Sequence, residues 1–183
     1  MKATGIVRRI DDLGRVVIPK EIRKTLRIRE GDPLEIFTDK EGEVILKKYS
    51  PIGELSEFAL QYAETLAKTS GHIACITDKD SVIAVSGAPK KEFLDKNVSF
   101  ELEKIMEEKM TWIVKNSTEK KVPILNNDNV DRYNAQVISP IVSEGDTIGS
   151  VILMATGTNS QMGDVEIKLA QSAAGFLGKQ MEQ

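Results

Sequence analysis

The chain has 183 residues, of which 40% are apolar and 29% are charged, a balance typical of a globular protein with a buried core and not of a disordered one. Cys75 is the only cysteine and His72 the only histidine, so an intrachain disulfide is excluded and a zinc cluster lacks its ligands. Because Met1–Gly5 has no apolar run of a signal peptide and no segment reaches the roughly 18 apolar residues of a membrane span, we expect a cytoplasmic protein without a metal site.

The net charge of −3 hides an asymmetry along the chain. Residues 1–50 carry twelve Lys and Arg against nine Asp and Glu, whereas residues 51–183 carry thirteen against nineteen. The basic side chains are concentrated in residues 1–29, which hold nine Lys and Arg against three acidic residues. Such a split indicates contact between the N-terminal segment and nucleic acid, and a solvated basic face is the simpler alternative.

The first thirty residues predict a β-hairpin followed by a short helix. Ile6–Ile10 and Val16–Ile18 are β-branched runs on either side of Asp11–Gly14, a turn sequence. Pro19 has no N–H for a strand ladder and suits the first turn of a helix, which we expect over about Lys20–Leu26. The inward face of this helix is expected to hold Ile22 and Leu26.

A second hairpin, Leu34–Thr38 and Glu43–Tyr49 around the turn Asp39–Gly42, completes a β-β-α-β-β pattern. A unit of this size buries too little apolar surface to be stable alone, and without a disulfide or a metal its usual remaining support is oligomerisation. We therefore predict that two copies interleave into one core, and that residues 1–50 form one domain and residues 51–183 another.

The second segment predicts an α+β domain, an antiparallel sheet flanked by helices. Ser50 and Pro51 suit the start of a helix that Gly71 ends, and a second helix is expected near Ser99–Met110. The third helix is expected from an apolar stripe of Val165, Leu169, Ala173, Phe176 and Leu177. The strands are expected over Ile73–Ile76, Val82–Val85, Trp112–Val114, Val122–Leu125, Gln136–Val142 and Thr147–Met154.

The remaining chemistry-bearing residues of this segment favour structural roles. Cys75 lies in an apolar run and is expected to be a buried small side chain, and His72 is expected to be structural. The acidic residues without calcium-loop spacing are interpreted as turn formers: Asp78, Asp80, Asp128 and Asp131. The aromatic residues expected in the core are Phe100, Trp112 and Tyr133. Since no group of nucleophile, base and oxyanion donors emerges, we expect a binding protein and not an enzyme.

The basic side chains of residues 8–24 suit DNA phosphates, and guanidinium forks also suit guanine edges. Arg8 and Arg9 are neighbours on the predicted strand and point to opposite faces, so only one of them joins a common surface. Arg23 and Lys24 lie about 100° apart on the short helix and can share an edge with Arg15. A dimer that presents Arg8, Arg15, Arg23 and Lys24 twice neutralises about eight phosphates, which gives log K a salt slope of about −7.

The run from Lys2 to Leu26 resembles the swapped-hairpin DNA-binding domain of the AbrB-type transition-state regulators, and the resemblance continues through Gly31–Ile36 and Leu46–Tyr49. It implies a homodimeric β-barrel of exchanged hairpins that grips double-stranded DNA and prefers deformable, AT-rich promoter regions to a strict consensus. The implied contact residues are Arg8, Arg15, Arg23 and Lys24. Lys24 departs from the pattern, because the best-known member has arginine there and lysine offers a point charge without a bidentate fork.

Residues 53–183 resemble a GAF domain, most clearly in Ser139–Val142, the Gly145–Asp146 turn and Ile148–Leu153. This hairpin specifies an architecture rather than a ligand, so we expect either an unknown small-molecule ligand or a pure dimerisation surface, with no cofactor assigned. The whole chain resembles sporulation regulators of endospore-forming bacilli. That resemblance implies an activator and repressor of sporulation-stage genes, and a homotetramer joined through the C-terminal domain.

Swapped-hairpin modules also occur in antitoxins, where a C-terminal tail wraps a toxin. Such tails are short, acidic and disordered, whereas about 130 residues of regular helix and strand pattern follow the module in this chain. The pattern favours a transcription regulator, and an antitoxin that neutralises a toxin partner is the alternative.

Overall fold

The chain divides into two compact units, Met1–Tyr49 and Ser50–Gln183, and each is described by itself. A computed structural model describes residues 5–157 and 162–182. Two expectations fall partly on Met1–Thr4, namely the absence of a signal peptide and the start of the AbrB-like run. These four residues lie outside the described residues. No helix within the described ranges has the length and apolar character needed to pass through a lipid bilayer.

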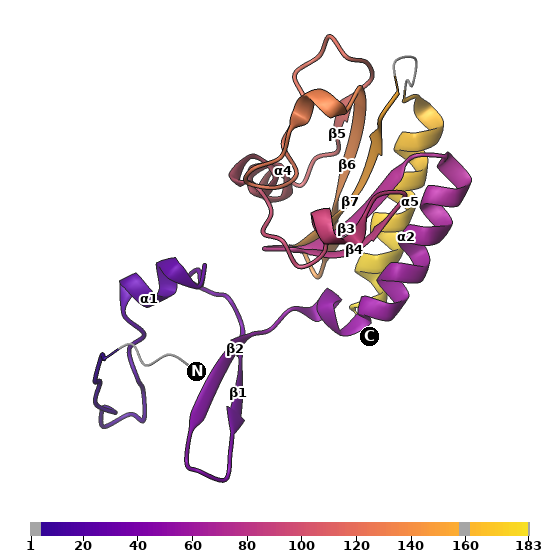
Figure 1. The fold of residues 1–183 in the computed structure, drawn as a ribbon. Coiled ribbons are helices and arrows are strands. Elements are labelled where there is room, and N and C mark those ends of the chain that lie inside the picture. The colour runs from indigo at the N-terminus through magenta and orange to yellow at the C-terminus, as the bar shows by residue number, and fades with distance from the viewer. Residues whose placement is uncertain (1–4, 158–161, 183) are drawn as a thin grey trace. The chain divides into compact units, whose positions relative to one another are not determined.

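In the first unit one helix and one hairpin follow the predicted order (Figure 1). Helix α1 spans Lys20–Thr25 and begins directly after Pro19, whose missing N–H costs nothing at a helix start. Strands β1 (Leu34–Thr38) and β2 (Val44–Lys48) pair antiparallel. The predicted helix and second hairpin are therefore confirmed to within two residues at each end.

The first predicted hairpin is wrong for the single chain. The described residues on either side of the turn form no strand; the turn itself is closed by the N–H of Asp11 on the Arg15 carbonyl and the N–H of Gly14 on the Asp11 carbonyl, both at 3.0 Å. Gly14 has a φ of +76°, a left-handed value that its missing Cβ permits. The turn forms as predicted, but a strand also needs backbone partners along its length, which the described part of the chain does not supply.

Apolar side chains of the first unit remain exposed. Val7 is 86% exposed, and Leu26, expected on the inward face of α1, is 55% exposed, so that expectation is wrong within one chain. Helix α1 contains no buried residue at all. The other exposed apolar side chains of this unit are Ile6, Ile10, Leu13, Val16, Val17, Ile36, Phe37, Val44, Leu46 and Tyr49. In the described part of the first unit, apolar side chains that are numerous enough for a core therefore remain exposed to solvent.

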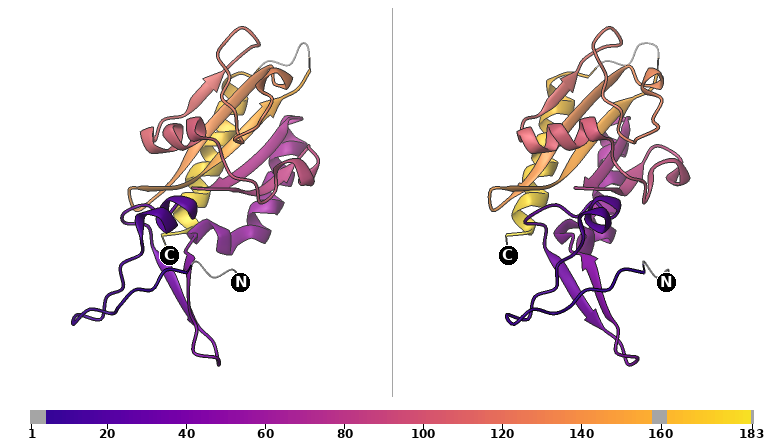
Figure 2. Two further views of the ribbon diagram at one scale, coloured as in Figure 1. Left: turned by 60° about the vertical axis from the view of Figure 1, so that its left-hand side comes forward. Right: turned by 90° about the vertical axis from the view of Figure 1, so that its left-hand side faces the viewer.

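The second unit is built on a five-stranded antiparallel sheet with the strand order β4-β3-β7-β6-β5. Helices α2 (Ser56–Ser70) and α5 (Asp164–Gln180) cover one face of this sheet, and α4 (Phe100–Glu108) covers the other (Figure 1 and Figure 2). The strands span Ile73–Asp78 (β3), Val82–Ser86 (β4), Trp112–Val114 (β5), Ala135–Ser143 (β6) and Asp146–Ala155 (β7). This arrangement confirms the predicted α+β architecture with its central antiparallel sheet.

Side-chain alternation along the strands divides the core into two layers. On β3, Ala74 and Ile76 belong to the layer under α2 and α5, whereas Cys75 between them belongs to the layer under α4. On β7, Leu153 and Ile152 divide in the same way. Both faces of the sheet are therefore covered by hydrophobic packing, as a sheet between helices requires.

Local signals set the helix boundaries in this unit. The Ser99 hydroxyl accepts the N–H of Leu102 at 3.0 Å, which caps α4, and Lys109 ends that helix with a φ of +55°. Ser50 accepts the N–H of Gly53, so its predicted cap begins a 3-10 turn, η1 (Pro51–Leu55), before α2 itself begins. Two further short elements, α3 (Lys90–Phe93) and η2 (Val130–Arg132), lie in the connections.

One predicted strand, Val122–Leu125, is wrong. Instead of a neighbouring strand, the buried side-chain amide of Gln136 accepts the N–H of Val122 at 2.9 Å and donates to its carbonyl at 2.8 Å. Leu125 makes an isolated bridge with Val98. The Gln136 side chain therefore satisfies the backbone N–H and carbonyl of Val122, which we had expected to pair with a neighbouring strand.

The apolar stripe of α5 is displaced from the predicted one. Val165 and Phe176, both expected on the inward stripe, are exposed. The buried face of α5 consists of Ala170, Ala173, Ala174, Leu177 and Gly178. A Cβ at Gly178 would collide with the Val142 carbonyl on β6, so small residues allow this helix to approach the sheet closely.

Candidate nucleic-acid interface

The four basic residues predicted to contact DNA lie on three segments of the first unit. Arg8 is exposed on the backbone before the turn, Arg15 follows the turn, and Arg23 and Lys24 lie in the last turn of α1. Arg8, Arg15 and Lys24 are exposed, whereas Arg23 is half-buried. Cations near a helix C-terminus are stabilised by the helix dipole, which suits the positions of Arg23 and Lys24.

Arg15 is held in place by Asp11 across the turn. One carboxylate oxygen of Asp11 accepts the N–H groups of Leu13 and Arg15 at 3.0 and 2.7 Å, and the other accepts Nε of the Arg15 side chain at 2.8 Å. These contacts, first the Arg15 N–H and then its guanidinium, hold the pKa of Asp11 below its ordinary value of 3.8. Since the ion pair uses Nε and the Arg15 side chain is 69% exposed, its two terminal nitrogens face solvent and can take a bidentate acceptor.

Other basic residues of the first unit have structural contacts. Lys48 donates to the Arg27 carbonyl at 2.8 Å and lies 3.5 Å from the Asp32 carboxylate. Asp32 in turn accepts the N–H of Arg29 at 2.8 Å. These contacts join the segment after α1 to strand β2, so Lys48 braces the fold. The sequence did not reveal this division between bracing and exposed cations, because it depends on contacts between residues far apart in the chain.

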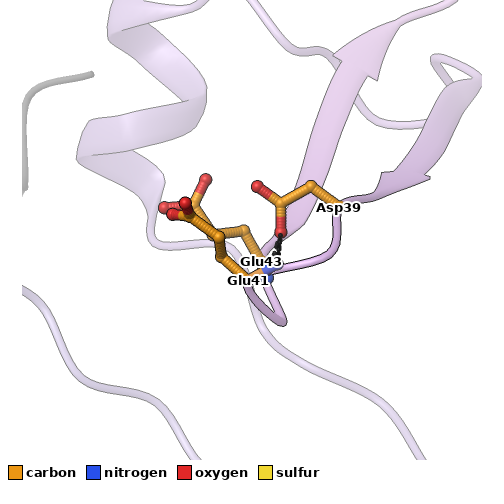
Figure 3. Close-up of side chains that lie close together, drawn as sticks. All are labelled: Asp39, Glu41 and Glu43. Atoms are coloured by element: carbon orange, nitrogen blue, oxygen red, sulfur yellow. Dashed lines mark hydrogen bonds between the residues drawn. The ribbon is translucent and has the colours of Figure 1, made fainter.

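Three carboxylates gather in the turn between β1 and β2. Figure 3 shows the side chains of Asp39, Glu41 and Glu43 in this turn. One carboxylate oxygen of each residue lies within 4.8 Å of the other two. All three are exposed, and an oxygen of Asp39 already accepts the N–H groups of Glu41 and Glu43 at 2.9 Å. The cluster is therefore explained as a turn that its aspartate closes.

The residues singled out in the second unit fall into separate local groups, such as Asp78 with Asp80 and Asp128 with Tyr133. Cys75 is fully buried as predicted, and burial raises the pKa of its thiol. His72 Nε2 lies 4.0 Å from the Glu166 carboxylate, which accepts the Gly163 N–H at the start of α5. Of the three aromatic residues, Tyr133 is buried as expected, whereas the expectation was wrong for Phe100 and Trp112, which are exposed.

Known proteins resemble both parts of the chain. A family model described as "Stage V sporulation protein T C-terminal, transcription factor" matches residues 54–182, and one described as "Antidote-toxin recognition MazE, bacterial antitoxin" matches residues 7–54. The chain is 56% identical to stage V sporulation protein T of Bacillus subtilis over the full length of both proteins. It is 55% identical to the transition state regulatory protein AbrB of the same organism over 69 residues, which cover 34% of this chain and 71% of AbrB.

The fold of the second unit also has counterparts among solved structures. The GAF domain of an Acinetobacter phosphoenolpyruvate-protein phosphotransferase matches with a TM-score of 0.55 at 9% identity, covering 69% of this chain and 81% of that one. The AbrB-type resemblance and the GAF-like fold are thus confirmed, whereas the exchanged-hairpin barrel stays a prediction. With a matched model over most of its length and a full-length relative at 56% identity, the chain belongs to the stage V sporulation protein T family of transcription factors.

Proposed function

We propose that this protein is a DNA-binding regulator of sporulation-stage genes that activates some promoters and represses others. Residues 1–50 would bind DNA and residues 51–183 would sense a ligand, join chains together, or do both. The observation that carries the proposal is the exposed basic set Arg8, Arg15 and Lys24, with Arg23 beside it, on a unit that cannot bury its own apolar residues. A DNA partner implies action in the cytoplasm.

The same exposed apolar residues support an obligatory dimer. Val7, Val16 and Val17 lie on the extended backbone around a formed turn, and this backbone lacks a strand partner in the described chain. A second copy would supply strand pairing for the backbone and apolar cover for the side chains. Exchange of the two hairpins into one barrel would also present every basic residue twice.

In the proposed complex, the basic residues divide the work of binding. Arg8, Arg23 and Lys24 would neutralise phosphates, which gives affinity without reading sequence. Arg15, oriented by Asp11, offers two terminal nitrogens to a phosphate or a guanine edge. Since phosphate contacts predominate, preference among promoters would come mainly from how easily AT-rich DNA deforms.

The aromatic edge between α2 and α5 supports a second association through the C-terminal unit. The Phe176 ring lies 5.9 Å from both Phe58 and Tyr62, and Phe176 is exposed. This cluster, in which Phe176 is exposed and Phe58 and Tyr62 are half-buried, lies along two adjacent helices and is suited to a helix bundle between chains. Pairing there would join two DNA-binding dimers into the homotetramer.

Salt dependence of DNA binding tests the proposed interface. We expect log K of the full-length protein for AT-rich promoter DNA to fall with log salt at a slope of about −7, and Arg15→Ala to reduce that slope by about 2, one unit for each copy in the dimer. Lys40→Ala is the matched control, because Lys40 is an equally basic, exposed residue in the β1–β2 turn. A slope shallower than about −2 for the unaltered protein would sink the proposed interface.

The antitoxin-type match to residues 7–54 favours one alternative, a module that neutralises a toxin. Purification of the protein from its native host separates the two functions. A small toxin chain that co-purifies in fixed ratio would support the alternative, whereas a complex with promoter DNA and no second protein supports the regulator.

A further inference from the structure

A polar cavity of about 620 Å³ opens at one edge of the second unit. One wall is formed by residues 92–97, which begin at the end of α3, and the other by residues 125–132, which precede β6. The bridge between Val98 and Leu125 ties the two walls together. Its volume lies within the range of small-molecule sites, and the cavity is lined mainly by polar and charged side chains.

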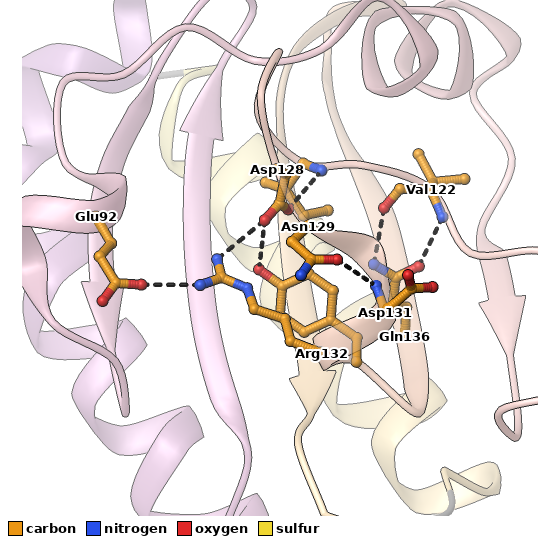
Figure 4. A network of polar contacts seen from close by, with 9 residues as sticks. Glu92, Val122, Asp128, Asn129, Asp131, Arg132 and Gln136 are labelled. Carbon is orange, nitrogen blue, oxygen red and sulfur yellow. Dashed lines mark hydrogen bonds and ion pairs between the residues drawn. The ribbon is translucent and has the colours of Figure 1, made fainter.

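Arg132 lines this cavity and is held by contacts to both walls. Its Nη1 donates to Glu92 at 2.8 Å from one wall, and its Nη2 lies 3.0 Å from Asp128 on the other (Figure 4). Its guanidinium also stacks 4.9 and 4.8 Å from the ring centroids of Phe93 and Tyr133. Burial acts to lower the pKa of Arg132, but its interactions with Glu92, then Tyr133 and last Asp128 outweigh that effect and raise it.

The two carboxylates on Arg132 differ in how firmly they are held. The Asp128 side chain is 1% exposed and accepts the Tyr133 hydroxyl and the Ile124 N–H, each at 3.1 Å, so it is part of the fold. The Glu92 side chain is 48% exposed, and its ion pair is its only described contact. A solvated ion pair of this kind contributes little, so a ligand carboxylate can replace Glu92 while Asp128 keeps Arg132 in place.

The charges around the cavity restrict what else the ligand carries. Glu92, Asp95 and Asp128 face Lys96 and Arg132, an excess of one negative charge, which disfavours ligands rich in phosphate. Asp95 lies in the wall with a φ of +61°, a conformation uncommon outside glycine, and its N–H bonds the Val82 carbonyl at 2.9 Å. The other polar groups are the amides of Asn97, Asn126, Asn127 and Asn129.

We propose that this cavity binds a small zwitterion of the amino-acid class, whose carboxylate replaces Glu92 on Arg132 and whose ammonium group lies against Asp95. The asparagine amides would then bind the polar part of its side chain. This site deepens, and rests on, the proposed sensory role of the second unit. It requires nothing of the first unit.

Calorimetry of the full-length protein with the common amino acids, one at a time at millimolar concentration, tests the proposal. We expect at least one of them to bind, and Arg132→Gln to weaken that binding about ten- to hundredfold, since a charge-assisted hydrogen bond is lost. Lys120→Gln removes an exposed cation elsewhere in the unit and should leave the affinity unchanged.

Arg132→Gln also leaves Asp128 without its cation and can unfold the unit, so a second variant carries the test. Glu92→Gln removes the competitor for Arg132 and should tighten amino-acid binding several-fold, a change of sign that loss of stability cannot imitate. The proposal is overturned if no amino acid binds the unaltered protein, or if Glu92→Gln weakens the binding. Promoter DNA binding, measured on the same samples, shows whether the proposed regulator survives that outcome.

Discussion

At the scale of single residues, the turn before α1 shows how a carboxylate contributes to a basic surface. Asp11 places a negative charge beside Arg15, which on charge alone opposes DNA binding. Its contacts, however, close the turn and occupy Nε, so the guanidinium is already oriented for the proposed DNA contact. An oriented side chain loses less conformational entropy on binding than one that is free to rotate.

The pKa of Asp11 provides a direct measure of this contact. By NMR titration we expect the pKa of its carboxyl to lie below 3.8 in the folded protein and to rise in Arg15→Ala, though only part of the way, because the largest cause is the Arg15 backbone N–H. A carboxyl with a lowered folded pKa adds stability that is complete above the unfolded value and is lost as pH falls through the folded one. Hence the contact should weaken only below about pH 4.

Arg23→Ala is the control for that titration, because Arg23 lies on α1 and makes none of the contacts to Asp11 described above. An Asp11 pKa that does not move in Arg15→Ala would show that the two side chains do not meet in solution.

At the scale of elements, small residues on α5 set its distance from the sheet. Gly178→Ala should destabilise the second unit by about 1–3 kcal/mol, since the new Cβ meets the Val142 carbonyl of β6 and one of the two elements must shift. Gly175→Ala, one turn earlier on the exposed side, meets nothing within 4 Å and should stabilise the helix by roughly 0.5–1 kcal/mol. Urea unfolding of both variants measures the difference, and equal effects would contradict the close approach.

The sequence predicted most of the elements, for reasons that also explain the exceptions. Local signals such as the Gly71 helix end and strand alternation located most of the described helices and strands to within a few residues. The predicted strand at Val122 failed because the side chain that pairs with it, Gln136, lies fourteen residues away. In the first unit the predicted strands around Asp11–Gly14 are absent from the described residues. The β-branched residues favour a strand, but they do not supply the neighbouring strand with which it must pair.

The proposed sites divide in the same way. The sequence identified the basic residues because charge and position on a strand or helix are local properties. Asp11, by contrast, was recognised only as a turn residue. The cavity around Arg132 was missed, and Asp128 was interpreted merely as a turn former. The cavity depends on the contact between Arg132 and Glu92, which lie forty residues apart in the chain, and no spacing in the sequence indicates such a contact.

At the scale of the whole molecule, the aromatic edge of α2 and α5 allows the proposed tetramer to be taken apart selectively. We expect sedimentation of the unaltered protein to give four times the chain mass of 20.2 kDa, and Phe176→Asp to give twice that mass, because a buried carboxylate would oppose the bundle. Phe100→Asp is the matched control, since Phe100 is an exposed aromatic residue at the start of α4. A dimer for the unaltered protein would contradict the tetramer.

The proposed dimer of the first unit has a consequence for the thermal unfolding of the protein. A unit that completes its sheet only with a second copy melts at a temperature that rises with protein concentration, because unfolding releases two chains. The second unit has two closed hydrophobic layers of its own, so its intrinsic stability does not depend on a partner in that way. Dilution should therefore lower the melting temperature of the first unit and leave that of the second unit unchanged. At low protein concentration the first unit would unfold while the second unit remains folded.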